Sequence, residues 1–217
     1  MFKRFSICYI LFMFCITGTS AQEDRWTGNA TNLSKGNLRV NSSGRYLEYS
    51  DGTPFLYMGD TAWELISRLN DKETELYLEN RREKGFTVIQ TVILDELDDM
   101  DVSSNGEPKL IDGNIDKPAP GYFTHVDKVI SLAAAKGLHI ALLPTWGDKV
   151  DKQWGKGPEI FTPENAYRYG KWLGERYMNA PNLIWIIGGD RSGDGKNFAI
   201  WLSLIHISEP TRLLSIS

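Results

Sequence analysis

The feature that most constrains the fold is the stretch 182–190, in which an apolar run ends at two glycines and a carboxylate. An uninterrupted apolar run of this length is typical of a strand buried on both faces of a parallel sheet. Gly188 and Gly189 permit a sharp turn and the close approach of a ligand. Asp190 is therefore expected at the carboxyl end of a strand, where α/β barrels carry their catalytic groups.

Three further apolar runs alternate with helical patterns along the chain. The runs cover 55–60, 86–94 and 138–143, and the helical segments cover 70–84, 122–136 and 162–177. Asn70 or Asp71 is expected to cap the first helix, and Thr162 followed by Pro163 is a typical helix start. Strands that alternate with helices predict successive βα units and a parallel sheet.

The connections between these segments are asymmetric. Long loops leave the ends of the strands, whereas the helices return through short junctions that repeat as Lys84-Gly85-Phe86 and Lys136-Gly137-Leu138. This asymmetry favours a (β/α)8 barrel over a doubly wound sheet, and no glycine-rich nucleotide motif follows the first strand. A complete barrel needs about 250 residues, so we expect about four βα units, the amino-terminal half. A β-hairpin, 38–40 and 46–49, is expected before them.

Both ends of the chain differ from the middle. Residues 1–21 have the basic start, apolar centre and small-residue exit of a secretory signal peptide, which predicts a periplasmic or extracellular protein without membrane attachment after cleavage. Residues 22–37 are expected to be an irregular lead-in. Residues 202–217 are similar to the translation of a sequencing adapter and are expected to lie outside the fold, so the predicted domain is 38–201.

The composition argues against several classes of function. Both cysteines lie within the predicted signal peptide, and the three histidines have no metal-ligand spacing, so we predict neither a metal site nor a cofactor. A net charge of −4 does not suggest a nucleic-acid partner. His125 and His139 are expected to be structural. The acidic group Asp98, Asp99 and Asp101 is interpreted as a solvated loop, with a calcium site as the alternative.

Polar and aromatic residues follow each predicted strand, where they would meet at one end of a barrel. Paired carboxylates with aromatic side chains are what glycoside hydrolysis uses, so Asp190 is the candidate acid. Asp60 and Asp190 could instead cap turns, and Gln90 and Trp146 could belong to the core. The candidates for sugar binding are Asp60, Trp63, Gln90, Glu96, Trp146, Asp148, Lys149 and Arg191.

Several motifs resemble the apiosidase-like glycoside hydrolases, a family best known from pectin-degrading gut Bacteroidetes. The resemblance extends over 38–201 and is carried by the segments 59–65, 77–81, 84–90, 142–149, 157–161 and 184–190. It implies a (β/α)8 barrel, usually followed by a small β-sandwich, and the release of apiose from rhamnogalacturonan II. It also implies that Asp190 is the general acid/base and that its partner is a Glu on a later strand.

The sequence ends before that Glu, so we expect this chain alone to be an inactive part of a polysaccharide-cleaving enzyme. The alternative is a non-catalytic carbohydrate-binding or interaction module. A nucleotide-dependent α/β enzyme is a weaker third interpretation because the sequence has no phosphate loop. The sequence does not indicate the oligomeric state.

Overall fold

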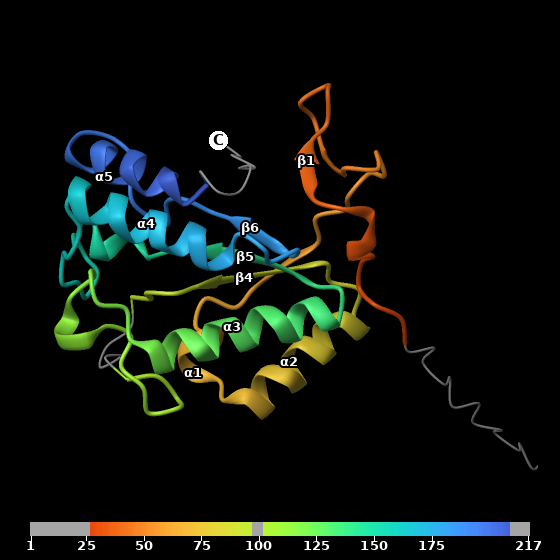
Figure 1. Ribbon diagram of the computed structural model, residues 1–217, viewed down its shortest axis with the longest axis horizontal. Helices are drawn as coiled ribbons and strands as arrows, with labels where there is room; N and C mark the ends of the chain where they lie inside the picture. Colours follow the sequence, from red (N-terminus) through yellow and green to blue (C-terminus); the bar gives the residue numbers. More distant parts are fainter. Residues whose placement is uncertain (1–26, 97–101, 209–217) are drawn as a thin grey trace, which may run out of the picture.

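The computed structural model describes residues 27–96 and 102–208, and its centre is a four-stranded parallel sheet in the order β3-β4-β5-β6 (Figure 1). A separate antiparallel hairpin, β1-β2, precedes it, as predicted. The strands are β1 (Leu38–Val40), β2 (Leu47–Tyr49), β3 (Gly59–Thr61), β4 (Val88–Val92), β5 (His139–Leu143) and β6 (Leu183–Trp185). The α-helices are α1 (Leu65–Arg68), α2 (Asp71–Glu83), α3 (Pro120–Ala135), α4 (Pro163–Tyr177) and α5 (Lys196–Leu204). Short 3-10 turns cover Leu33–Lys35, Ile111–Gly113, Gly147–Lys149 and Ile205–Ser208.

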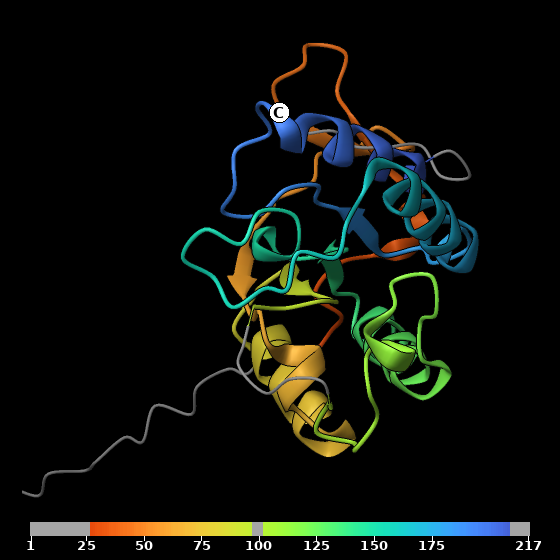
Figure 2. The ribbon, with the colours of Figure 1, turned by 90° about the vertical axis from the view of Figure 1, so that its left-hand side faces the viewer.

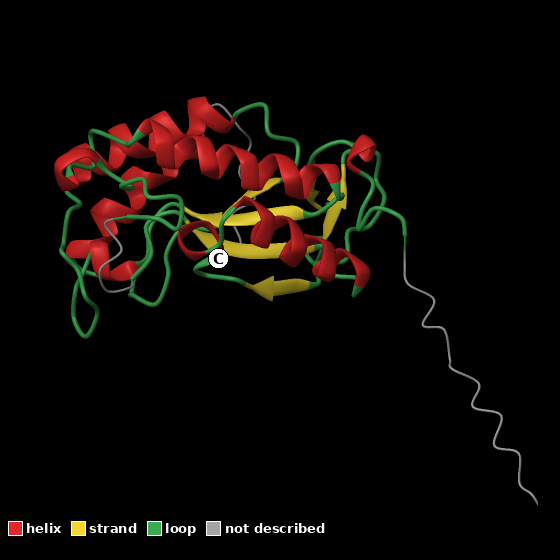
Figure 3. Cartoon of the chain, turned by 90° about the horizontal axis from the view of Figure 1, so that it is seen from below, coloured by secondary structure: helices red, strands yellow, loops and turns green. Residues whose placement is uncertain are grey.

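The helices run alongside the strands (Figure 3), and residues of α2, α3 and α4 pack in one core against one face of the sheet. Ile89 and Ile140 are register partners on this face and belong to the main core with residues of α2, α3 and α4. The opposite face carries Gln90, Ala141 and Ile184, which are also in register. Sequential parallel strands with helices on one side only are the arrangement of consecutive units of a (β/α)8 barrel, which confirms the predicted fold class.

The helix starts follow local hydrogen bonding. Asn70 caps α2 in a capping box with Glu73, and Thr162 caps α4 in the same way with Asn165. Each box satisfies amide groups that would otherwise have no partner at the helix end. Pro163 occupies the first turn, where its missing amide hydrogen costs nothing.

The first predicted barrel strand is shorter than its apolar run. The run covers 55–60, but β3 begins at Gly59. The Thr87 hydroxyl donates to the Leu56 carbonyl at 2.7 Å and accepts from the Met58 amide at 2.9 Å. A side chain thus replaces the regular ladder before β3, which periodicity alone does not reveal.

The hairpin lies beside the amino ends of the barrel strands, opposite the long loops (Figure 1). Tyr49 and Phe55 pack there with Val88 and Ala141 in a second, smaller core. The ring of His139 lies 4.9 Å from that of Phe55 and 6.2 Å from that of Tyr49, measured between centroids. The hairpin therefore covers the amino end of the sheet and leaves its carboxyl end for ligands.

The carboxyl-terminal segment differs from the expectation that 202–217 lies outside the fold. Helix α5 continues to Leu204, and Leu204 and Ile207 are buried in the main core. The Leu204 backbone approaches Gly170 of α4 so closely that a β-carbon there would lie 2.8 Å from its carbonyl oxygen. An apolar segment beside an uncovered helix face packs whatever its origin. The adapter resemblance itself stays a prediction, and residues 209–217 lie outside the described ranges.

The predicted signal peptide, 1–21, also lies outside the described residues. Within the described ranges, no helix combines the length and apolarity that crossing a membrane requires.

The two repeated junctions offer a matched test of close packing. Gly85 and Gly137 both adopt a left-handed conformation, with φ of 80° and 70°. A β-carbon on Gly85 meets nothing within 4 Å, whereas one on Gly137 would lie 2.4 Å from the Thr31 carbonyl oxygen. We expect Gly85→Ala to lower the free energy of unfolding by about 1 kcal/mol, the backbone strain alone. Gly137→Ala should lower the free energy of unfolding, measured in urea, by at least about twice that amount, because the new β-carbon also meets the Thr31 backbone. Equal losses would contradict this packing.

The buried His139 should make the free energy of unfolding depend on pH in the acid range. Burial lowers the pKa of His139 from 6.5 to about 4. The unfolded chain binds this proton below pH 6.5 and the folded chain does not, so the free energy of unfolding falls as pH drops from 6.5 towards 4. The expected loss is about 3 kcal/mol. His139→Gln should reduce the pH dependence in urea unfolding by that amount, and an unchanged acid slope would contradict the assignment.

Candidate functional site

The candidate site lies at the carboxyl ends of β4, β5 and β6, the end of the molecule that Figure 2 faces. Four segments approach one another here: residues after β3, the exit of β4, the loop after β5 and the exit of β6. The structure brings together most of the residues predicted from the sequence, namely Trp63, Glu96, Trp146, Asp148, Asp190 and Arg191.

Asp190 directly follows the turn after β6, and its carboxylate is ion-paired with its neighbour. Asp190 Oδ2 lies 2.5 Å from Arg191 Nη1, and 32% of the Asp190 side chain is exposed. Packing against Gly147 confines it, because a β-carbon on Gly147 would lie 2.8 Å from Asp190 Oδ1. Asp190 is thus an oriented carboxylate with access to solvent, which is what a group that must reach a substrate requires.

Arg191 fixes the loop after β5 to the exit of β6. Its side chain is fully buried. Nε donates to the Asp151 carbonyl at 2.7 Å, and Nη2 donates to the Lys152 carbonyl at 3.0 Å. A planar guanidinium suits such a multiple contact because its donors have fixed directions. Within the described structure, these bonds give Arg191 a positioning role, and the sugar contact suggested by the sequence stays a prediction.

Asp148 and Lys149 organise the same loop. The Asp148 carboxylate accepts from Lys149 Nζ at 3.0 Å and from the Gly157 amide at 2.8 Å, and its side chain is fully buried. Lys149 Nζ also donates to the Gly157 carbonyl at 2.7 Å. Both were predicted as sugar-binding groups, and the structure shows them holding the loop closed.

Gly155 marks the closest convergence of this region. A β-carbon on Gly155 would lie 2.4 Å from Asp148 Cβ, 2.8 Å from Glu96 Oε1 and 2.9 Å from Arg191 Nη2. The loop backbone therefore fills the space between the exits of β4 and β6, and any side chain at this position would displace these groups. Glu96 is placed beside the other candidates, although it comes from a different strand.

Aromatic side chains line the face of the site towards β3. The rings of Trp63 and Trp146 lie 5.3 Å apart, tilted by 51°. Trp146 Nε1 and Asp148 Oδ1 are buried, and neither has a hydrogen-bond partner among the residues that the structure describes. Buried polar atoms of this kind are costly unless a further group reaches them.

Gln90 lies deeper, on the sheet face away from the helices. Its Nε2 donates to the Tyr57 hydroxyl at 3.0 Å, and burial raises the pKa of Tyr57. Tyr57 was missed in the sequence analysis. Tyr57 lies in the apolar run that leads into Gly59 and Asp60, and this position could have marked it as a candidate. The direction of its side chain depends on the irregular backbone before β3, which the sequence does not show.

Asp60 is not part of this group. It is the register partner of Ile89, so its side chain lies on the helix-covered face. Its Oδ2 accepts from the Tyr77 hydroxyl at 2.7 Å and is ion-paired with Arg81 Nε at 2.6 Å. Burial, together with the Asp60 charge, raises the pKa of Tyr77 to about 12. Asp60 thus links β3 to α2, and its suggested role in sugar binding stays a prediction.

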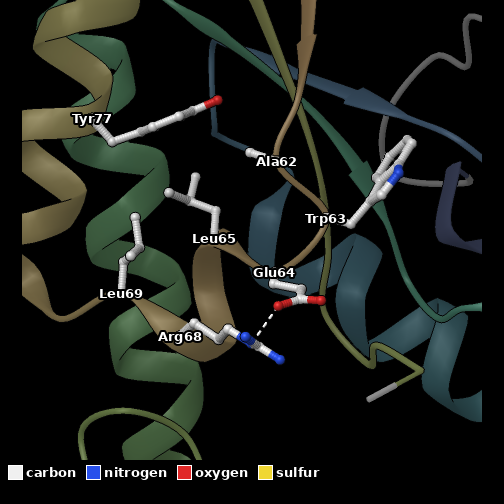
Figure 4. Close-up of a pocket in the computed structure, with 7 residues that line it drawn as sticks. All are labelled: Ala62, Trp63, Glu64, Leu65, Arg68, Leu69 and Tyr77. Carbon is white, nitrogen blue, oxygen red and sulfur yellow. Dashed lines mark ion pairs between the residues drawn. The ribbon is translucent and has the colours of Figure 1, made fainter.

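A pocket of about 330 Å³ lies next to α1 and is lined by Ala62, Trp63, Glu64, Leu65, Arg68, Leu69 and Tyr77. Glu64 and Arg68 form an ion pair at its edge, and Trp63 points away from Leu65 and Tyr77 (Figure 4). The pocket thus lies on the helix side of the segment, whereas the Trp63 ring packs on Trp146. None of the candidate carboxylates lines it.

Two polar residues outside this group, Asp95 and His125, have structural partners. Asp95 is buried and accepts from Lys109 Nζ at 2.8 Å and from the Ser67 hydroxyl, which attaches the long loop after β4 to α1. His125 is buried and lies 3.1 Å from Asp71, in line with a structural role. Across 27–96 and 102–208, no three residues that could hold a metal ion come together. The acidic group 98–101 lies outside the described residues.

The buried Asp148 predicts a large loss of stability on substitution. Asp148→Asn puts an amide donor where the Gly157 amide and Lys149 now donate, and it leaves Lys149 without its charge partner. We expect the free energy of unfolding to fall by about 3 kcal/mol. As a control, Asp116→Asn breaks the exposed pair with Arg168 and should cost at most about 1 kcal/mol. Similar losses in urea unfolding would contradict the role given to Asp148.

Comparisons with known proteins agree with this geometry. Residues 41–212 match the family model "Apiosidase-like, catalytic domain". A solved structure described as a glycoside hydrolase is 38% identical, with a TM-score of 0.71 over 82% of this chain and 39% of its own. A glycoside hydrolase family 5 structure from Bacteroides vulgatus is 32% identical, with a TM-score of 0.73 over 84% of this chain and 39% of its own.

A putative glycoside hydrolase from the same organism, 19% identical with a TM-score of 0.62, shares the fold. The chain spans 38–39% of the length of these three structures. Among proteins of curated function, none matches the chain. Since the family model covers most of the sequence, the chain belongs to the family of apiosidase-like catalytic domains.

Proposed function

We propose that this chain forms part of a glycoside hydrolase in which Asp190 is the general acid for cleavage of an O-glycosidic bond. The observation that carries the proposal is a partly exposed carboxylate at the carboxyl end of β6, oriented by Arg191 and Gly147. Membership of the apiosidase-like family and the similarity to two glycoside hydrolase structures support the reaction class.

In the proposed reaction, Asp190 donates a proton to the glycosidic oxygen while that bond breaks. A second carboxylate either attacks the anomeric carbon or activates water, according to its distance from the acid. The family resemblance gives this role to a Glu on a later strand. Among the nearby acids, Asp148 is unsuited to the task because it is fully buried and bound to Lys149 and Gly157.

The sugar is proposed to lie between the aromatic pair, Trp63 and Trp146, and the loop after β5. An aromatic face packs against the C–H groups of a sugar ring, and carboxylates and amides accept or donate to its hydroxyls. We assign such contacts to Glu96, which lies near Gly155 of the loop, and to Gln90, whose Nε2 donates to the Tyr57 hydroxyl. Lys149 shapes this wall through its bonds to the loop.

For the substrate, we propose an apiose-containing side chain of a pectin such as rhamnogalacturonan II. The support is the description of the matching family as apiosidase-like. We further propose that the protein is exported, on the basis of the signal-like pattern in 1–21.

The reaction predicts a specific effect of one substitution in the full-length protein. Asp190→Asn removes the proton donor but leaves the side-chain size unchanged, so release of apiose from rhamnogalacturonan II should fall by about 10²–10⁴-fold in kcat. Asp194→Asn, at an exposed acid four residues further on, should retain the wild-type rate. Activity that survives Asp190→Asn would assign the acid to another carboxylate, and a wild-type enzyme that releases no sugar would contradict the proposed substrate.

A further inference from the structure

Trp154 is an exposed aromatic side chain in the loop after β5, and the proposed reaction does not use it. It exposes 71% of its surface, more than any other large apolar side chain described except Leu76. An exposed tryptophan alone indicates nothing, since single apolar residues are common on surfaces. The contacts that hold Trp154 are therefore the informative observation.

The Arg191 guanidinium packs on the Trp154 ring, with its central carbon 4.1 Å from the ring centroid. The same guanidinium binds the carbonyls of Asp151 and Lys152, directly before the tryptophan. Gln153 adopts a left-handed conformation with φ of 39°, which is uncommon for a residue other than glycine. The loop thus holds the indole in one place, although most of its surface faces solvent.

Trp154 is also connected to the proposed acid. Arg191, whose guanidinium packs on the indole, is ion-paired through Nη1 with the Asp190 carboxylate at 2.5 Å. Gly155, the next residue, packs against Glu96 and Asp148. The exposed indole face can pack against the C–H groups of a sugar ring. The guanidinium that contacts this indole also holds the carboxylate that would protonate the glycosidic oxygen.

We propose that Trp154 is a substrate-binding platform on which a sugar ring of the polysaccharide stacks next to the bond to be cleaved, and that Arg191 positions both the platform and Asp190. This inference rests on the proposed glycoside hydrolase function and adds a specificity residue to it. It commits to a neutral sugar ring as the ligand, because the exposed indole offers an apolar face and the charge of Arg191, which packs on that indole, is already paired with Asp190.

The test uses the full-length protein carrying Asp190→Asn, so that binding is measured without turnover. Rhamnogalacturonan II oligosaccharides and a panel of other pectic and hemicellulosic oligosaccharides are titrated by calorimetry. Trp154→Ala should raise Kd by about tenfold, and Trp154→Phe should recover most of the affinity. Tyr46→Ala, at an exposed aromatic residue of the hairpin turn, is the control and should leave Kd unchanged.

Acrylamide quenching gives a second readout. The difference in fluorescence between the protein with Trp154 and Trp154→Phe is the emission of Trp154. Acrylamide should quench this emission readily in the free protein, and the bound oligosaccharide should protect it. An unchanged Kd in Trp154→Ala, or an indole already shielded without ligand because the rest of the protein covers it, would overturn the inference.

The two proposals fail in different ways. If the wild type hydrolyses the substrate and Trp154→Ala leaves Kd unchanged, the glycoside hydrolase function is supported and the sugar-binding role of Trp154 is contradicted. Binding that depends on Trp154 without hydrolysis of any glycoside supports the platform as a sugar site and contradicts the enzyme. A full-length protein that binds none of the oligosaccharides contradicts both.

Discussion

The alternation of side chains along four parallel strands determines what each residue of this molecule can do. Because register partners share a face, one row meets the helices and the next row faces away from them. Asp60 lies in the first row and is therefore held by Tyr77 and Arg81, whereas Gln90 lies in the second and contacts Tyr57. The hairpin covers the amino ends of the parallel strands, so the candidate site lies at their carboxyl ends.

At that end, Arg191 connects the parts of the candidate site. A single guanidinium binds the Asp190 carboxylate, two backbone carbonyls of the loop after β5 and the face of Trp154. A charge so deeply buried is stable only when its donors are satisfied, and here they are satisfied by groups from two strand exits. The geometry of the proposed acid and the position of the loop are therefore not independent of each other.

Much of the architecture could be predicted from the sequence because caps, apolar runs and glycine stops are local signals. The parallel order and the helix starts at Asn70 and Thr162 followed from them. The direction of side chains was harder to predict from the sequence. The burial of Asp148 depends on a loop whose backbone returns to it at Gly157. The direction of Asp60 towards the helices depends on the residue at which β3 begins. The packing of Leu204 on α4 could not be foreseen from a tail that resembles foreign sequence.

The most direct test of the account is a crystal structure of the full-length protein with a bound oligosaccharide substrate and the Asp190→Asn substitution. The account predicts a glycosidic oxygen within hydrogen-bonding distance of residue 190, about 3 Å, at the carboxyl ends of β4, β5 and β6. It would be contradicted by a sugar seated elsewhere, for example in the pocket beside α1, with residue 190 remote from any glycosidic bond.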